Sequence, residues 1–386
     1  MKLRAEILDV VESPLVKIAT AAESMPGSIK LCYGESDMPT PEFICRAGYE
    51  ASLAGHTFYT HTAGSPELRA AIAAKIYELQ GVSYSPAEVM STVGATMAIH
   101  VAIRALVGRE DNAVIVAPAY ALYHNSVIMS GGEPRPVPLA HDGSRFSLDL
   151  DRLERAIDRH TRLVVVNSPS NPTGWMMTES EQRAIADIAA RHGVVILSDE
   201  VYERLTFDAP IAPSLARVID DKDRLIVVNS FSKTYNMTGW RLGWAQGSEA
   251  VIRQLYKAAE FITSNPTALV QQAGIVALRD GDTYVRDLRS HYAARRAQVS
   301  TALRTLPGVT LPDPQGAFYA FPRIDGLSDS TAFTADVLRE SGVALAPGVA
   351  FGASGEGYLR LCFAASEATV TEALERLKQF WTRRRN

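Results

Sequence analysis

Four short runs of aliphatic residues recur along the middle of the chain, between about residues 90 and 245, and longer stretches with helical spacing separate them. The runs are Ala113–Val116, Leu163–Val166, Val194–Leu197 and Leu225–Val228, and each is mostly valine and isoleucine. Continuous apolar runs suit strands that are buried on both faces, which means a parallel sheet covered by helices. We therefore predict an α/β fold.

The 386 residues are more than one domain usually holds, at about 150 residues for each domain. Beyond about residue 285 the pattern changes, and helical stretches alternate with short strand-like pieces. We expect a large domain over residues 41–284, and a small α+β domain made of residues 1–40 and 285–386. The predicted helices are Met97–Leu106, Glu179–Arg191, Glu249–Phe261, Tyr284–Leu306 and Ser330–Ser341; the later strands are Ala317–Phe321, Val343–Ala346 and Tyr358–Phe363.

Polar residues, glycine and proline follow each of the four apolar runs. The segments are APAY (Ala117–Tyr120), NSPSNPTG (Asn167–Gly174), SDEVYE (Ser198–Glu203) and a longer one, Asn229–Trp244. In an open α/β sheet the carboxyl ends of the strands form the edge at which ligands bind. The four segments therefore predict a ligand site at that edge.

Composition excludes several classes of function. The net charge is −4, and no clustered basic face is present for nucleic acid. The three cysteines, Cys32, Cys45 and Cys362, show no CxxC spacing and predict neither a disulfide framework nor a metal site. No run approaches the ~18 apolar residues of a membrane span, and the first residues lack the core of a signal peptide. We expect a cytoplasmic protein.

Lys233 is the residue with the strongest chemical signal. It lies in Ser230-Phe231-Ser232-Lys233, directly after a predicted buried strand, among small hydroxyl residues. Desolvation and nearby positive charge lower the pKa of such a lysine, which gives the neutral amine that forms a Schiff base. The alternative is a lysine that extends to solvent.

Residues that precede and follow this lysine in the sequence predict an anion site. Arg241 and Ser230 can bring a guanidinium and a hydroxyl onto one phosphate group. Gly94, Ala95 and Thr96 lie between a strand-like stretch and a helix, where backbone N–H groups and the helix N-terminus attract an anion.

Asp199 ends an apolar strand, so its carboxylate needs a partner. It is either the cap of the following helix or the ion-pair partner of the protonated ring nitrogen of pyridoxal 5′-phosphate (PLP), which keeps that ring an electron sink. Tyr202 and Asn171 can donate hydrogen bonds to the phenolic oxygen of the same ring. Tyr120 is either a core tyrosine or a residue that stacks on the ring.

These motifs resemble the fold-type I PLP enzymes, and specifically the class I aminotransferases related to bacterial aspartate aminotransferases. The resemblance covers nearly the whole chain. The motifs are Gly34, Tyr59-Thr60, Gly64, Leu68-Arg69, NPTG, SDEVY, SFSK, GWRLG, GAFYAF (Gly316–Phe321), PGVAFG (Pro347–Gly352) and YLRLCF (Tyr358–Phe363).

The resemblance implies a large domain with a mostly parallel sheet of seven strands, and a homodimer with shared active sites. It implies that Arg360 holds the substrate carboxylate, that Gly34 contacts it through the backbone, and that Tyr59 reaches the phosphate group in the neighbouring subunit. Arg360 is unusual on its own evidence, because an arginine inside an apolar strand normally has an anionic partner.

We expect transamination from an L-amino acid to a 2-oxo acid in a ping-pong cycle, with Lys233 as Schiff base and proton shuttle. The alternatives are a carbon–sulfur β-lyase, a PLP-sensing regulator and a protein without PLP. A regulator would need a DNA-binding domain, and only about 30 residues precede Gly34 here.

The substrate side chain is not fixed by any motif. Arg104 lies eight residues after Thr96 on the same predicted helix, roughly on the same face. Some bacterial aspartate aminotransferases use a basic residue on this helix to hold the distal carboxylate. We therefore predict acidic substrates, aspartate or glutamate; the alternative is that Arg104 is a solvated residue or part of an interdomain ion pair.

Overall fold

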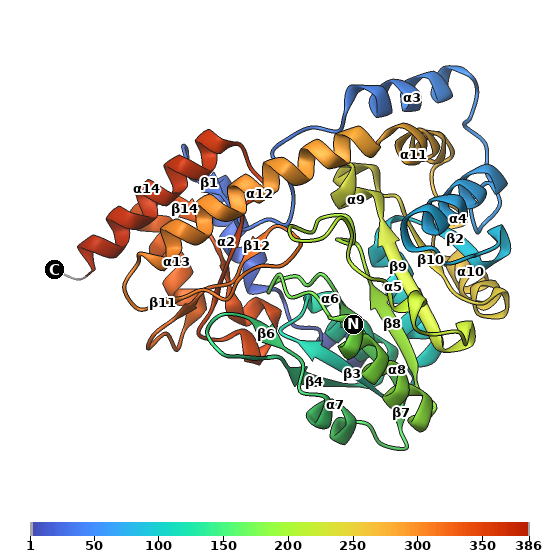
Figure 1. Cartoon of the computed structure of the whole chain (residues 1–386), viewed down its shortest axis with the longest axis horizontal. Coiled ribbons are helices and arrows are strands. Elements are labelled where there is room, and N and C mark those ends of the chain that lie inside the picture. Colours follow the sequence, from blue (N-terminus) through green and yellow to red (C-terminus); the bar gives the residue numbers. More distant parts are fainter. Residues whose placement is uncertain (1–2, 385–386) are drawn as a thin grey trace.

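The computed structural model describes residues 3–384, and a seven-stranded sheet enclosed by helices forms its centre (Figure 1). The order across the sheet is β2-β10-β9-β8-β7-β3-β4, and β10 alone is antiparallel to its neighbours. The predicted α/β fold with a mostly parallel sheet is therefore confirmed. The strands are β2 (Val89–Thr92), β3 (Asn112–Ala117), β4 (Glu133–Pro138), β7 (Thr161–Asn167), β8 (Val195–Asp199), β9 (Leu225–Ser230) and β10 (Gly243–Gln246).

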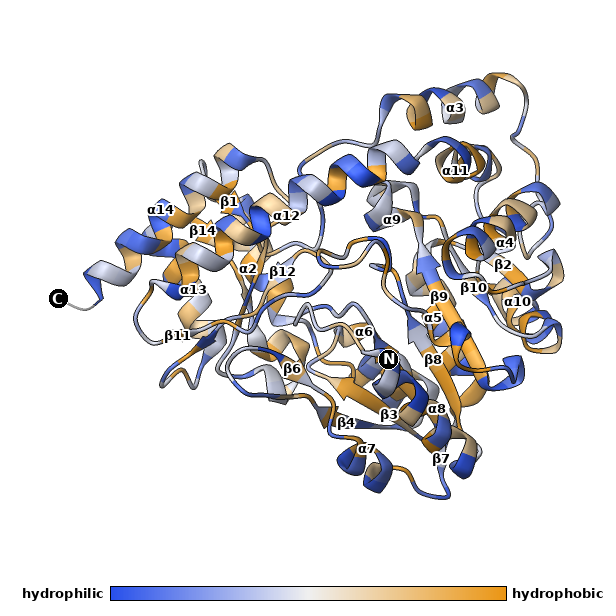
Figure 2. Ribbon diagram, in the orientation of Figure 1, coloured by the Kyte–Doolittle hydropathy of each residue, from blue (hydrophilic) through white to orange (hydrophobic). Residues whose placement is uncertain are grey.

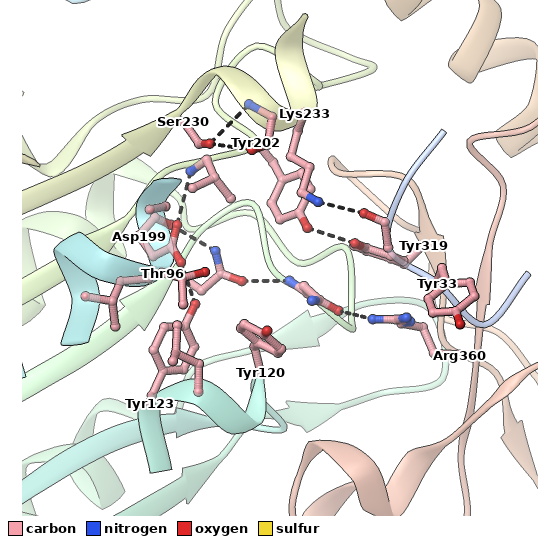
Figure 3. A pocket seen from close by; sticks show the side chains of 18 of the residues that line it. Tyr33, Thr96, Tyr120, Tyr123, Asp199, Tyr202, Ser230, Lys233, Tyr319 and Arg360 are labelled. Carbon is pink, nitrogen blue, oxygen red and sulfur yellow. Dashed lines mark hydrogen bonds between the residues drawn. The ribbon is translucent and has the colours of Figure 1, made fainter. Parts of the chain in front are cut away.

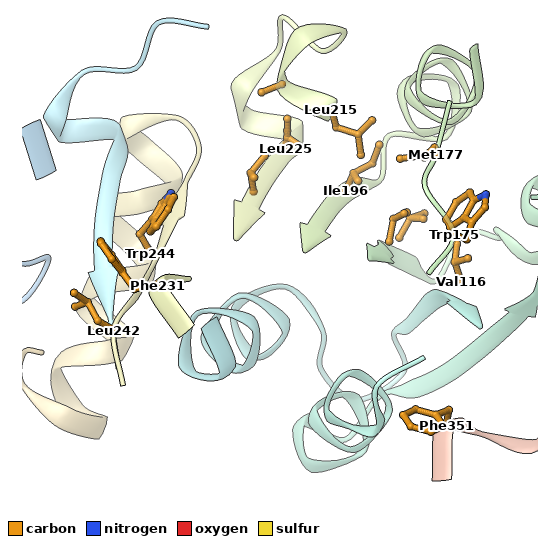
Figure 4. Packing of buried hydrophobic residues seen from close by; sticks show 14 of the residues in the cluster. Val116, Trp175, Met177, Ile196, Leu215, Leu225, Phe231, Leu242, Trp244 and Phe351 are labelled. Atoms are coloured by element: carbon orange, nitrogen blue, oxygen red, sulfur yellow. The ribbon is translucent and has the colours of Figure 1, made fainter. Parts of the chain in front are cut away.

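Both faces of the sheet are buried. In β3, Val114 and Val116 belong to the apolar cluster that includes helices α7 (Leu150–Ala156) and α8 (Glu179–His192). Ala113 and Ile115 belong to the cluster on the other face, with α5, α6 and α10. Burial on both sides explains why β3, β7, β8 and β9 each contain a continuous apolar run (Figures 2 and 4). The three helices of this second face are α5 (Gly94–Leu106), α6 (Ala121–Ser130) and α10 (Glu249–Thr263).

Two strands of the sheet were not predicted from the sequence. Strand β4 reads EPRPVP and pairs with β3 at the edge of the sheet. Its prolines occupy alternate positions, so the N–H groups that they lack would point away from β3, and an edge strand tolerates this. Strand β10 has only four residues and runs antiparallel between β2 and β9. It is therefore not part of the alternation of parallel strands and helices from which the other strands were predicted.

A third apolar cluster brings the N-terminal and C-terminal parts of the chain together. Leu31 belongs to it, with residues of α14 and of a three-stranded sheet, and β1 pairs in parallel with β14. Helix α12 joins this part to the rest (Figure 1), and the expected domain boundary at residue 284 falls in its first turn, where it stays a prediction. The elements here are α2 (Pro14–Glu23), β1 (Ile29–Lys30), α12 (Asp282–Arg304), β11 (Val309–Thr310), β12 (Tyr319–Ala320), β13 (Arg323–Ile324), α13 (Ser330–Ser341), β14 (Val343–Ala344), β15 (Ala346–Pro347), β16 (Leu359–Cys362) and α14 (Glu367–Arg383).

The remaining elements connect or cover these two parts. They are α1 (Ala5–Leu8), α3 (Glu42–Leu53), α4 (Pro66–Gln80), β5 (Ala140–His141), β6 (Phe146–Ser147), α9 (Phe231–Thr234), α11 (Ala268–Asp280) and six short 3-10 helices. Across residues 3–384, no helix combines the length and the apolar character that crossing a membrane requires.

Two buried glutamates follow β8 inside the protein. Glu200 accepts hydrogen bonds from Ser198 Oγ at 2.8 Å and from the Leu215 N–H at 3.1 Å. Glu203 accepts one from Gln80 Nε2 at 3.0 Å. Burial, together with the neighbouring Glu203, raises the pKa of Glu200 from its ordinary 4.5 to about 8.

We predict that Glu200→Gln makes the free energy of unfolding less dependent on pH. The folded wild type keeps the Glu200 proton up to about pH 8, whereas the unfolded chain loses it near pH 4.5. The folded state therefore binds more protons in this window, and its stability falls as the pH rises, by up to about 1.4 kcal/mol for each pH unit. Urea unfolding between pH 5 and about 8 measures the slope. Glu375→Gln, at an exposed position of α14, is the matched control, and an unchanged slope in Glu200→Gln would contradict the prediction.

Candidate active site

A cavity of about 330 Å³ lies at the carboxyl ends of β7, β8 and β9 (Figure 3). Its walls come from segments that are far apart in the sequence, including the loop before α3, the start of α5 and strand β16. The structure brings most of the predicted site residues to this cavity: Gly34, Ala95, Thr96, Tyr120, Asn171, Asp199, Tyr202, Ser230, Ser232, Lys233, Arg241 and Arg360.

Lys233 lies in the short helix α9, which starts directly where β9 ends. Its Nζ donates a hydrogen bond to the Gly34 carbonyl oxygen at 2.7 Å. Burial lowers the pKa of Lys233 from 10.5 to about 8. Near pH 8 about half of the amine is neutral, which makes it a nucleophile and a base.

Asp199 is the last residue of β8 and the one carboxylate among the residues that line the cavity. Its Oδ2 accepts a hydrogen bond from the Tyr123 hydroxyl at 2.6 Å, and its Oδ1 accepts one from the Val201 N–H at 3.2 Å. Burial raises the pKa of Asp199 to about 6, against the effect of these donors. A buried carboxylate of this kind is suited to a cationic N–H group of a ligand.

The start of α5, two serines and Arg241 form one end of the cavity. Ala95 and Thr96 lie at the N-terminus of α5, where unpaired backbone N–H groups attract anions. Gly94 has a φ of +72°, and a Cβ on it would lie 2.3 Å from Arg241 Nη2. Arg241 itself has a φ of +52°, a strained conformation that is often found at functional sites.

Arg360 lies at another side of the cavity, in β16, and its side chain is buried. Its Nη1 donates to Asn171 Oδ1 at 2.9 Å, and its Nη2 donates to the Cys32 carbonyl oxygen at 2.5 Å. Within residues 3–384 its buried Nε has no hydrogen-bond partner. In the described part of the chain, the guanidinium therefore has one unused donor and no ion-pair partner, which suits an anionic ligand.

Tyrosines form another part of the wall, among them Tyr120, Tyr123, Tyr202 and Tyr319. Tyr202 is buried, and its hydroxyl lies 2.8 Å from the hydroxyl of Tyr319. Tyr120 is 43% exposed, so it is not the core tyrosine of the alternative interpretation. Tyr123 and Tyr319 were not selected from the sequence. Tyr123 lies one helical turn after Tyr120 and Tyr319 lies in the GAFYAF motif, and these were the available signals.

Three of the predicted residues, Gly94, Arg104 and Tyr59, do not line this cavity, and Gly94 instead lies against Arg241. Arg104 is exposed near the end of α5, about 12 Å along the helix axis and about 80° around it from Thr96, so it does not share a face with that residue, and it is not among the residues that line the cavity. Its role as a substrate ligand stays a prediction from the sequence. Tyr59 is 89% exposed, and its expected contact with a second subunit stays a prediction.

This arrangement defines the site of an enzyme. A nucleophilic amine lies in the same cavity as two guanidinium groups, which can hold anionic groups, and one buried carboxylate. The comparisons now identify the family. Residues 26–377 match the family described as aminotransferase class I and II. The chain belongs to this family, and the protein is an enzyme of the aminotransferase type.

The relatives to which this chain is similar are named after different substrates. It is 33% identical to aspartate aminotransferase of Bacillus subtilis, over 98% of this chain and 99% of the relative. It is 35% identical to aromatic-amino-acid aminotransferase 2 of Thermococcus litoralis, over 98% of each chain. The structure of N-succinyldiaminopimelate aminotransferase from Mycobacterium tuberculosis superimposes with a TM-score of 0.93 at 33% identity, covering 97% of this chain and 99% of that one.

We predict that Gly94→Ala weakens retention of PLP, the cofactor that the family uses, about tenfold, the value of one charge-assisted hydrogen bond. The added Cβ displaces Arg241, while the positive φ costs roughly 1 kcal/mol of stability. Dialysis followed by visible absorbance measures bound cofactor. Gly239→Ala, two residues before Arg241 and with no atom within 4 Å of the new Cβ, is the control. Equal retention in both variants would contradict a role of the Gly94–Arg241 contact.

Proposed function

We propose that this enzyme transfers the amino group of an L-amino acid to a 2-oxo acid, with PLP bound to Lys233 as a Schiff base. One observation carries the proposal: the Nζ of Lys233, an amine with a lowered pKa, lies in one cavity with Asp199, Arg241 and Arg360. The family assignment supports the same reaction type.

The residues of the cavity fit PLP. Arg241, the hydroxyls of Ser230 and Ser232 and the N-terminus of α5 would hold its phosphate, and Gly94 leaves the space that this requires. Asp199 would hold the protonated ring nitrogen, Tyr202 and Asn171 would bind the phenolic oxygen, and Tyr120 would lie against the ring. When bound, PLP supplies an electron sink for the charge left on the substrate carbon.

Lys233 would then act at the substrate α-carbon. Its Nζ, freed when the substrate amine takes its place, removes the α-proton, and a base is most effective when its pKa lies near the working pH. Asp199 would keep the ring nitrogen protonated. The first amino acid leaves as a 2-oxo acid before a second 2-oxo acid enters, which is a ping-pong order.

Arg360 would hold the α-carboxylate that amino acids and 2-oxo acids share. Its Nε, which has no hydrogen-bond partner among residues 3–384, supports this role, as does the position of Asn171, which orients Nη1. We propose that aspartate and glutamate are among the donors, supported by the name of the Bacillus subtilis relative. Arg104 gives no support to this choice, because it is outside the cavity of its own chain.

We predict that Lys233→Ala lowers turnover by more than about a thousandfold, since it removes both the covalent attachment and the base. Borohydride reduction of the wild type with PLP, followed by peptide mapping, should place the label on Lys233. Lys257→Ala, at an exposed position of α10, should retain both label and activity. A label on any other lysine would sink the assignment.

We predict that Arg104→Ala leaves the ranking of amino donors unchanged. Arg360→Lys, by contrast, should weaken the binding of every amino donor and every 2-oxo acid acceptor, since a point charge cannot replace the planar guanidinium. The measurement is kcat/KM for aspartate, tyrosine and alanine with 2-oxoglutarate. A loss of kcat/KM confined to aspartate in Arg104→Ala would instead show that Arg104 binds the substrate. A wild type that prefers alanine would contradict the proposal of acidic substrates but would leave the proposed aminotransferase reaction standing. Cleavage of a cysteine-type donor without an acceptor would indicate the β-lyase instead.

A further inference from the structure

Tyr319 is a cavity residue with a contact network of its own. It lies in β12, and its side chain is fully buried. Its hydroxyl lies 2.8 Å from the Tyr202 hydroxyl, and its ring lies 4.6 Å from the Arg360 guanidinium carbon. Tyr319 therefore contacts two residues of the proposed site at once, one through its hydroxyl and one through its ring (Figure 3).

The backbone of the cavity is shaped to receive this hydroxyl. A Cβ at Gly34 would lie 2.5 Å from the Tyr319 hydroxyl oxygen, so any other residue at position 34 would have to displace it. Gly34 also offers its carbonyl oxygen to Lys233 Nζ at 2.7 Å. One glycine thus lies against both the amine and the hydroxyl.

The two tyrosine hydroxyls have two protons between them. Burial raises the pKa of both groups, so both are neutral and each holds one proton. The contact between them uses one of the two protons. If Tyr202 donated to Tyr319, no proton of Tyr202 would be left for a ligand, whereas donation by Tyr319 leaves the proton of Tyr202 free to point into the cavity.

We propose that Tyr319 is a positioning residue, which donates its hydroxyl proton to Tyr202 and so directs the proton of Tyr202 toward the ligand oxygen. This inference rests on the proposed function, in which that oxygen is the phenolic oxygen of PLP. A hydrogen bond from Tyr202 withdraws negative charge from the oxygen, and the neighbouring Schiff-base nitrogen then holds its proton less tightly. Tyr319 thereby lowers the pKa of the Schiff base without contacting it.

Tyr319→Phe is a clean test because it keeps the ring beside Arg360 and removes only the hydroxyl. With PLP bound, we expect the pKa of the Schiff base, read from the visible absorbance over a pH series, to rise by about 0.5 to 1 unit. We expect kcat to fall about threefold to tenfold, the same range of free energy, while KM for the amino acid changes less than twofold.

Tyr292→Phe is the matched control. Tyr292 is also fully buried and belongs to the same apolar cluster, and its hydroxyl has no partner within residues 3–384. It does not line the cavity. The same chemical change there should leave the pKa of the Schiff base where it is, which separates the effect of position from that of losing a buried hydroxyl.

A double variant tests whether Tyr319 acts through Tyr202. Tyr202→Phe should raise the pKa of the Schiff base by itself, and adding Tyr319→Phe should raise it no further. Additive shifts, or an unchanged pKa in Tyr319→Phe, would overturn the inference and leave the proposed function standing. A wild type that forms no absorbing Schiff base with PLP at Lys233 would overturn both.

Discussion

Burial of the central sheet on both faces is the constraint on which the rest of the site depends. A charged side chain on either face of such a sheet would be buried among apolar residues, because helices cover both faces, and an unpaired buried charge is costly. Polar groups therefore collect where the strands end. The register pairs Asn167 with Asp199, and Ser230 is the last residue of the next strand along, so these groups are neighbours at one edge. Lys233 follows one turn later, in a helix too short to carry it away from that edge.

The electrostatics of the cavity follow from this crowding. Three cationic side chains, Lys233, Arg241 and Arg360, line it with the single carboxylate of Asp199. Burial lowers the pKa of Lys233 and raises that of Asp199, so both values move toward neutrality. Contacts within the described chain do not fully offset the desolvation free energy of these buried groups, since the Arg360 guanidinium retains an unpaired Nε there. A ligand with anionic groups at two positions can satisfy these groups.

Much of the fold could be predicted because the local sequence pattern of an element reflects which of its faces are buried in the folded protein. The apolar runs mark strands buried on both sides, and the helix from Glu179 ends within a residue of its expected limit. Strand β4 escaped prediction because its prolines are tolerated only at an edge, and edge position is a property of the whole sheet. The expected shared face of Thr96 and Arg104 was wrong, because eight residues rotate a helix by about 80° from its starting face, and Arg104 is exposed.

The sequence by itself determined the chemistry that is available at the edge of the sheet. Lys233 and Asp199 are recognisable because one follows a strand and the other ends one, and strand ends are local features of the chain. Only the tertiary structure decided which distant groups complete the site: Gly34 against Lys233, Tyr123 against Asp199, and Tyr319 against Tyr202, separated by between 76 and 199 residues. Such contacts depend on how helices and strands pack, because a hydrogen bond needs its partners within about 3 Å and no local pattern encodes that distance.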